Sequence, residues 1–159
     1  NLSLASPNSL FDMYDPERPI YTRPRFLPGA VLDGSTLDNV LLADGCRISH
    51  AKIDHSIIGL RSQIANGTRI SKTIVMGNDY YDPSGQPLPH NMSLGIGPNC
   101  DIEGAILDKN VRIGAGVAIR SFPRGTELKG EDWSIRDGIV VVPKGTVIPA
   151  ETYIGLETS

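Results

Sequence analysis

The chain has no long apolar run, little excess of charge and few aromatic residues. No stretch approaches the roughly 18 consecutive apolar residues of a membrane-spanning helix, and no secretory signal is evident. A net charge of −3 gives no reason to expect binding to nucleic acid or to an anionic membrane. The sequence therefore predicts a cytoplasmic protein that binds neither.

Cysteine is scarce, and so are the motifs that carry catalysis. Cys46 and Cys100 are the only two cysteines, and each takes the small-residue position of a repeat described below, which predicts buried, reduced thiols. The chain has no GxxxxGK[ST] phosphate loop, no GxSxG motif and no acidic pair placed to hold Mg²⁺ beside a nucleotide. We therefore expect no catalytic residue, no metal and no cofactor within it.

A six-residue repeat is the strongest pattern that is present. An aliphatic residue is followed by Gly, Ala or Pro, and three residues later by a small residue, in seven places whose first residues are Leu42, Ile58, Ile64, Ile96, Ile113, Val142 and Ile148. Such repeats are typical of solenoids in which each coil stacks on the last. Parallel crossovers are normally right-handed, but hexapeptide solenoids are the exception. The sequence predicts an all-β, left-handed parallel β-helix over 31–159, with three faces closing in 16 or 17 residues.

Proline marks the segments that leave this pattern. Residues 1–30 contain five prolines and no periodicity, so we expect an irregular arm, extended over another surface, that links the solenoid to an earlier part of a longer protein. Residues 77–94 and 120–135 interrupt the repeat with further Pro and Gly, which predicts two excursion loops. Solenoid insertions often carry function.

Histidine offers one route to independent chemistry. His50 and His55 are five residues apart on adjacent faces, and His90 lies in the first loop. Three imidazoles could hold zinc in a carbonic anhydrase-like trimer, and one could serve as the base of a hexapeptide acyltransferase. Both stay open as alternatives to a non-catalytic domain, although His90 sits in a Pro-rich loop and no other histidine completes a zinc site.

Cationic residues offer a second route, to anion binding. They are scattered along the arm, the coils and the second excursion, and a lone one is normally a solvated surface residue. Several that converge would bind phosphate or carboxylate, because Arg presents a two-pronged donor and Lys a point charge.

Five phrases are more specific than a generic solenoid. They are YDPERPIYTRPRFLP (14–28), KIDHSIIGLRSQI (52–64), IVMGNDYYD (74–82), GIGPNCDIEGAILDKNVRIGAGV (95–117) and SIRDGIVVVPKGTVIP (134–149). Together they resemble the C-terminal portion of the glucose-1-phosphate adenylyltransferases, also called ADP-glucose pyrophosphorylases. The resemblance covers nearly the whole chain. The first excursion is shorter than in plant members, which predicts a bacterial source.

The resemblance implies a role for this chain within a larger enzyme. The family joins ATP and glucose 1-phosphate into ADP-glucose and pyrophosphate, with Mg²⁺, for glycogen or starch synthesis. An N-terminal nucleotidyltransferase domain, absent here, carries that reaction. The β-helix domain packs against it and against other subunits of a tetramer, and allosteric anions such as sugar phosphates, phosphate or AMP bind where the domains meet. The chain is thus expected to regulate and assemble, and to be inactive alone.

The resemblance also implies which residues bind the effector. Lys144, in GIVVVPK, matches an effector-binding lysine of the family, and Arg23 and Arg25, in YTRPRFLP, lie in the arm that borders the same cleft. A second family lysine is missing, because this chain reads Ile-Arg-Ser-Phe-Pro at 119–123. Two alternatives follow: either Arg120 or Arg124 replaces it, or the effector itself differs.

Overall fold

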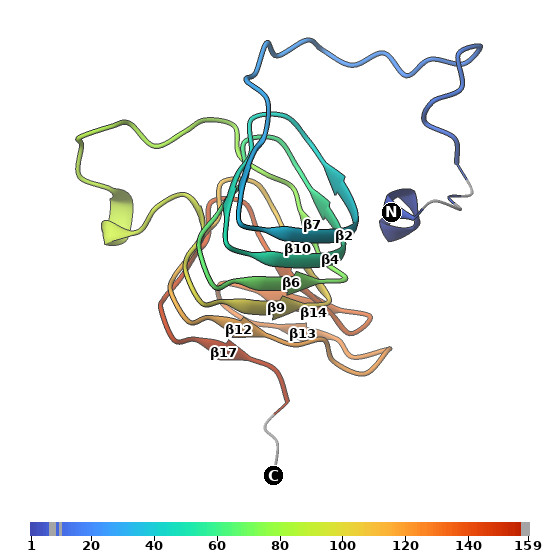
Figure 1. Cartoon of the computed structure of the whole chain (residues 1–159). Coiled ribbons are helices and arrows are strands. Elements are labelled where there is room, and N and C mark those ends of the chain that lie inside the picture. Colours follow the sequence, from blue (N-terminus) through green and yellow to red (C-terminus); the bar gives the residue numbers. More distant parts are fainter. Residues whose placement is uncertain (7–8, 10, 157–159) are drawn as a thin grey trace.

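The computed structural model describes residues 1–6, 9 and 11–156, and these include a solenoid of stacked parallel strands (Figure 1). The predicted β-helix is confirmed. The coils contribute strand residues to three flat faces. Register steps of 16 and 17 residues, such as Val31 to Arg47 and Lys52 to Arg69, agree with the predicted coil length.

Face 1 is a six-stranded parallel sheet. Its strands, in spatial order, are β1 (Val31–Asp33), β3 (Arg47–Ser49), β5 (Gln63–Ile64), β8 (Gly95–Ile96), β11 (Arg112–Ile113) and β16 (Val147–Ile148).

Faces 2 and 3 form one continuous sheet, because two long strands, β2 (Thr36–Leu42) and β4 (Lys52–Ile58), turn the corner between the faces without a break. Asn39 and His55 make that turn with φ near +50°. Face 2 continues through β6 (Arg69–Ser71), β9 (Asp101–Glu103), β12 (Ala118–Ile119) and β17 (Tyr153–Ile154). Face 3 continues through β7 (Ile74–Val75), β10 (Ala105–Leu107) and β15 (Ile139–Val142).

The core is a narrow column of aliphatic side chains inside the coils. Ile70, Ile102 and Ile119 stack in register on face 2, and each is almost completely buried. Cys46 and Cys100 are buried at corners, as predicted, and burial raises the pKa of both thiols.

Buried hydroxyl groups connect neighbouring coils at the corners. The Ser56 hydroxyl donates to the Asp54 carbonyl and accepts the Thr73 N–H, and the Thr73 hydroxyl repeats this pattern one coil further on with Ser71 and Ala105. Every buried polar group in this series therefore has a partner, as an apolar column requires.

The second excursion is more ordered than the loop predicted from the sequence. It contains β13 (Leu128–Lys129) and β14 (Ser134–Arg136), which pair antiparallel with each other and extend face 3 beyond β15. The buried side chain of Ile135, with Phe122 and Trp133 packed against the core, provides apolar contacts that a polar loop lacks. The glycine and proline residues in 120–130 had favoured the prediction of a loop, and the sequence pattern therefore did not indicate this short hairpin.

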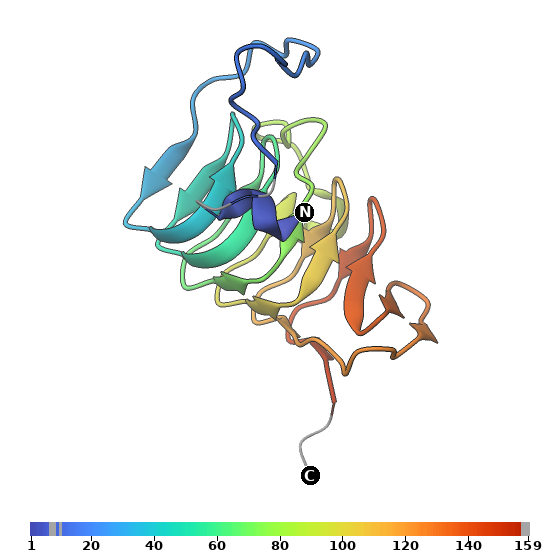
Figure 2. The same cartoon turned by 90° about the vertical axis from the view of Figure 1, so that its right-hand side faces the viewer.

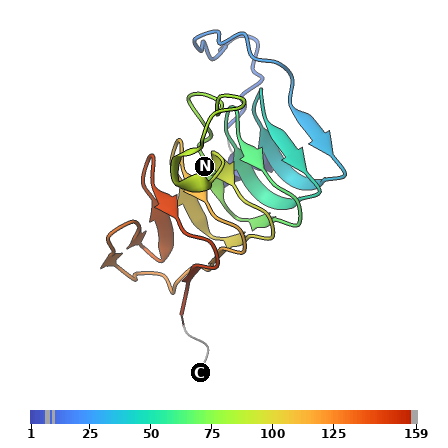
Figure 3. The same ribbon diagram turned by 90° about the vertical axis from the view of Figure 1, so that its left-hand side faces the viewer.

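In the described residues, the regular structure of the arm and of the first excursion is limited to short helical turns. The arm has η1 (Leu2–Ala5), which lies against β2 and β4 (Figure 2), and its residues 11–30 reach β1 without regular structure. The first excursion has η2 (Pro89–Asn91) and projects from the side of the coils (Figure 1), so it lies in front of them when that side faces the viewer (Figure 3). Tyr21 and Phe26 of the arm are more than 90% exposed, at 91% and 96%, so the arm does not bury these rings within this chain.

The buried column predicts a clear hierarchy of mutations. Ile102→Ala, at a site with 0% exposure, should lower the free energy of unfolding by about 2–5 kcal/mol, because it removes buried methyl groups and leaves a cavity. Ile139→Ala is the matched control, since Ile139 is 41% exposed, and should cost about 1 kcal/mol or less. Urea denaturation of both variants measures the difference. Equal losses would contradict a core made of this column.

Candidate anion-binding site

The corner between faces 3 and 1 stacks charged residues from successive coils. Main-chain hydrogen bonds connect this corner from coil to coil: the Arg61 N–H donates to Asp44, the Asn78 N–H to Leu60, and the Gly145 N–H to Lys109. Because the Leu107–Val142 register pairs β10 with β15, Lys109 and Lys144 occupy the same place in neighbouring coils. Their positive charges are therefore close together.

The arm runs over this corner. The Gly45 N–H donates to the Pro28 carbonyl at 2.9 Å, which fixes the end of the arm to the first coil. A groove of about 430 Å³ lies between the arm and the corner; we call it the arm groove, and its lining comprises Arg23, Pro24, Arg25, Leu60, Arg61, Met76, Asn78, Asp79 and Lys109. Four of these side chains are cationic, so the groove attracts anions.

One carboxylate, that of Asp79, bridges two of the cations. Asp79, at the start of the first excursion, contacts the Lys109 Nζ through Oδ1 and the Lys144 Nζ through Oδ2, both at 2.7 Å. The Asn110 amide donates to Asp79 Oδ2 at 3.0 Å and its oxygen accepts the Asp79 N–H at 2.8 Å. Lys109, followed by Lys144 and Asn110, lowers the pKa of the Asp79 carboxyl far below its usual value.

Tyr81 braces the same region. Its hydroxyl donates to the Gly45 carbonyl at 2.9 Å, and its ring lies about 6 Å from the guanidinium groups of Arg47 and Arg61, at 5.9 and 6.0 Å. These distances fit cation–π contacts. Arg61 also donates to the Asn78 carbonyl, so this arginine is held in place before any ligand arrives.

The structure gathers some of the predicted effector residues and separates others. Arg23 and Arg25 line the arm groove, and Lys144 joins it through the shared Asp79. Arg120 lies instead after β12, at the corner between faces 2 and 3, where it pairs with Asp101 at 2.6 Å. Arg124 follows in the second excursion and approaches Asp137 at 3.5 Å. The prediction that either arginine joins Lys144 in one site has no support in this arrangement.

Three residues of the groove were missed as site residues by sequence reasoning: Arg61, Asp79 and Lys109. A signal for Lys109 was present, because Lys109 and Lys144 each follow a buried aliphatic residue, Leu107 or Val142, by two positions. Aligning the repeats corner by corner would have paired the two lysines. Asp79 carried no such signal, since it lies outside the repeat.

The histidines do not come together. His50 lies at the corner between faces 1 and 2, near Asp33, and His55 lies at the corner between faces 2 and 3. His90 lies in η2 of the first excursion. Within residues 1–6, 9 and 11–156, no group of three or more His, Cys, Asp or Glu side chains is placed to hold a metal ion.

A buried ion pair anchors the first excursion to the coils. Arg112 donates to both oxygens of Asp82, at 2.6 and 3.0 Å, and to the Met92 carbonyl at 2.6 Å. Asp82 also accepts the Leu94 N–H. Only 7% of the Arg112 side chain and 13% of the Asp82 side chain are exposed. This clamp fixes both ends of the loop, and hence the place from which Asp79 departs.

Removing the clamp should destabilise the chain in a pH-dependent way. Asp82→Asn leaves Arg112 buried without its counter-charge, which should cost about 3–5 kcal/mol at neutral pH. Arg112 lowers the pKa of the Asp82 carboxyl. The stabilisation that this ion pair gives the folded chain is therefore present above the ordinary aspartate pKa of about 3.9. It is lost as the pH falls through the lowered pKa.

Urea denaturation between neutral and strongly acidic pH tests this prediction. The wild-type chain should lose more stability on acidification than Asp82→Asn. Glu103→Gln, which removes an exposed pair with Lys72, is the control and should change stability by no more than about 1 kcal/mol. Similar losses in the two variants would contradict a structural role for the buried pair.

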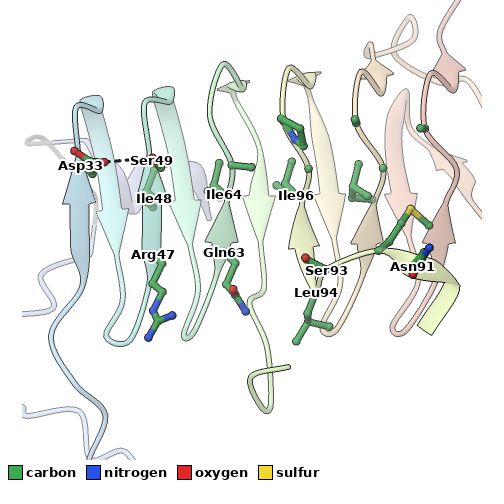
Figure 4. A pocket seen from close by; sticks show the side chains of 18 of the residues that line it. Asp33, Arg47, Ile48, Ser49, Gln63, Ile64, Asn91, Ser93, Leu94 and Ile96 are labelled. Carbon is green, nitrogen blue, oxygen red and sulfur yellow. Dashed lines mark hydrogen bonds between the residues drawn. The ribbon is translucent and has the colours of Figure 1, made fainter. Parts of the chain in front are cut away.

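A larger hollow than the arm groove lies on face 1. It has a volume of about 840 Å³, and the loop segment with Asn91, Ser93 and Leu94 borders it (Figure 4). Its floor is the outer surface of β3, β5, β8 and β11, with small residues such as Ala65 and Ala115. Asp33 and Arg47 are its only charged lining residues in the described part of the chain, so it suits an apolar surface better than a phosphorylated ligand.

The stacked coils and their parallel sheets define a hexapeptide-repeat β-helix. A model of the GLGC left-handed parallel β-helix domain matches residues 25–153. The chain therefore belongs to this family, and the predicted left-handed winding is confirmed.

A relative supports the same assignment. Over 151 residues the chain is 41% identical to the small subunit of a chloroplastic or amyloplastic glucose-1-phosphate adenylyltransferase from Triticum aestivum, a match that includes 91% of this chain and 32% of the relative. The chain thus spans about a third of the length of that protein. The resemblance seen in the sequence is confirmed, whereas neither the acyltransferase nor the carbonic anhydrase alternative gains support. These findings do not test the predicted bacterial source.

No helix in the described ranges combines the length and hydrophobicity that crossing a bilayer would require.

Proposed function

We propose that this chain is the regulatory and assembly part of a glucose-1-phosphate adenylyltransferase. Its relative carries that name and is about three times as long, so a nucleotidyltransferase domain, with the Mg²⁺ that the reaction uses, is the expected partner. The chain supplies no catalytic residue in this proposal. Its contribution is to contact that domain and other copies of itself, in a tetramer of the kind the family forms, in the cytoplasm.

The arm groove is the proposed effector site. Four cationic side chains line a hollow of about 430 Å³, and Lys144 adds a fifth charge through its contact with Asp79. Phosphate groups favour such clusters because arginine donates two parallel hydrogen bonds and lysine provides a concentrated charge. The observation that carries the proposal is this convergence of arm and coil cations on one groove. The ligands proposed are small anions, such as sugar phosphates, phosphate or AMP.

The position of the groove suggests how an effector would act. Arg23 and Arg25 belong to the arm, whereas Arg61, Lys109 and Lys144 belong to rigid corners of the coils. An anion that bridges the two sets favours the arm position in which both can touch it. Because the arm leads toward the proposed catalytic domain, this bias changes the interdomain arrangement and the affinity for substrate.

Removal of one lysine tests the site. In the 159-residue chain, Lys144→Gln should weaken binding of inorganic phosphate by about five- to tenfold, since it removes one charge-assisted contact. Isothermal titration calorimetry measures the dissociation constant. Lys52→Gln is the matched control, because Lys52 is an exposed lysine of β4 on face 2, and should leave binding nearly unchanged.

The intact enzyme provides the functional test. Lys144→Ala should weaken activation by the effector while leaving turnover without effector nearly intact. An equal loss of both would argue against an effector role. If phosphate neither binds the 159-residue chain nor raises its melting temperature, the domain is an assembly module without an effector site.

A further inference from the structure

Asp79 is placed in the arm groove as an anion would be. Its two oxygens contact two different ammonium groups at the same distance, 2.7 Å from Lys109 and from Lys144. Other exposed carboxylates of the solenoid, such as Glu103 and Glu127, each pair with one cation. Asp79 thus makes the contacts that a phosphate oxygen pair would make at the same corner.

A fixed partner keeps Asp79 in that position. The side-chain amide of Asn110 contacts Asp79 twice: its oxygen accepts the Asp79 main-chain N–H, and its nitrogen donates to the Asp79 carboxylate. Asn110 is itself buried, with 9% exposure, and has φ of +61°, so its amide has little freedom to turn away. The carboxylate is therefore oriented by Asn110 as well as by the two lysines.

The stacked lysines need an anion. Lys109 and Lys144 follow residues that pair in register across β10 and β15, and neighbouring strands of a sheet are about 4.8 Å apart. Two ammonium groups in this arrangement repel each other unless a negative charge lies between them. Within this chain Asp79 supplies that charge. An external anion could supply it equally well.

We propose that Asp79 is a built-in competing anion, which occupies the lysine pair of the arm groove until a phosphate dianion displaces it. This inference rests on the proposed function of the groove as an anion site. In this inference Asp79 determines which anions the arm groove binds. The ligand must bind the two lysines better than an aspartate that is already in place.

The competition favours phosphate over carboxylate ligands. A phosphate monoester carries about −1.5 to −2 charges at pH 7 and three strong acceptor oxygens, whereas a monocarboxylate carries one charge and two oxygens. A monocarboxylate therefore gains nothing at the lysines that Asp79 does not already provide. A phosphate gains charge there and can also accept from Arg25 or Arg61, which line the same groove.

Displacement has a structural consequence. Asp79 is followed in the chain by Tyr80 and Tyr81, and Tyr81 holds Arg61 and the Gly45 carbonyl. Release of Asp79 from the lysines frees the first residues of the loop that carries this tyrosine. Occupancy of the groove is thereby coupled to the loop, in addition to the arm.

Asp79→Asn tests the competition directly. The substitution keeps the size of the side chain and removes its charge. In the 159-residue chain, we expect inorganic phosphate to bind about tenfold more tightly than in the wild type, since the competing charge is gone. Acetate, which should bind the wild type too weakly to measure, should become a measurable ligand. Calorimetric titration with each anion gives the dissociation constants and their ratio.

A matched control separates this effect from net charge. Asp54→Asn changes the charge equally at an exposed site of β4 on face 2. It should change the phosphate dissociation constant by less than about twofold, because screening weakens distant charges. A gain as large as that of Asp79→Asn would overturn the proposal.

A second variant guards against a failure of Asp79→Asn to fold. Asn110→Gly removes the amide that orients Asp79, tolerates the positive φ at this position and leaves every charge in place. It should also tighten phosphate binding, by a smaller factor of about two to five. Thermal unfolding gives a further readout. Asp79→Asn should melt lower than the wild type without phosphate and should gain more stability when phosphate is added.

The outcomes distinguish this inference from the proposed function. If Lys144→Gln weakens phosphate binding but Asp79→Asn leaves it unchanged or weaker, the groove is an anion site and Asp79 is only a structural latch. If the wild-type chain and Asp79→Asn both fail to bind phosphate, the effector site itself is wrong. Tighter phosphate binding with lost discrimination against acetate supports both.

Discussion

In-register stacking of aliphatic side chains is the constraint on which the rest of this structure depends. Because Ile70, Ile102 and Ile119 must fill one column on face 2, each coil begins and turns at nearly the same place as its neighbour. The corners are then stacked as strictly as the core. Residues at equivalent positions of successive coils therefore become near neighbours along the solenoid axis, even where both are polar or carry the same charge.

This constraint turns corner residues into a potential binding site. Lys109 and Lys144 are 35 positions apart in the sequence, yet they meet because Leu107 and Val142 pair in β10 and β15. A stack of like charges needs a counter-charge, and the first excursion supplies Asp79 at this corner. The Arg112–Asp82 clamp fixes the loop from which Asp79 comes. The loop and the cationic corner are therefore joined by ion pairs, and the arm adds two arginines to the same groove.

The two hollows of the surface suit different partners. The arm groove is lined by Arg23, Arg25, Arg61 and Lys109 and suits a small anion. The hollow on face 1 is floored by small and aliphatic residues and suits another protein surface. This division fits the proposed role, in which the domain binds a small effector and packs against its neighbours. The exposed rings of Tyr21 and Phe26 on the arm add further apolar surface.

The sequence by itself determined the β-helix, the coil length, the burial of Cys46 and Cys100 and the two interruptions. Each follows from local spacing of aliphatic, small and Pro or Gly residues, and local spacing is visible in one dimension. The resemblance also selected Lys144, Arg23 and Arg25. Tertiary structure alone decided that Asp79 joins them, that Arg120 and Arg124 lie at another corner, and that the second excursion forms a hairpin. These facts depend on which coils are neighbours and where a loop returns, and contacts between distant segments leave no periodic trace in the chain.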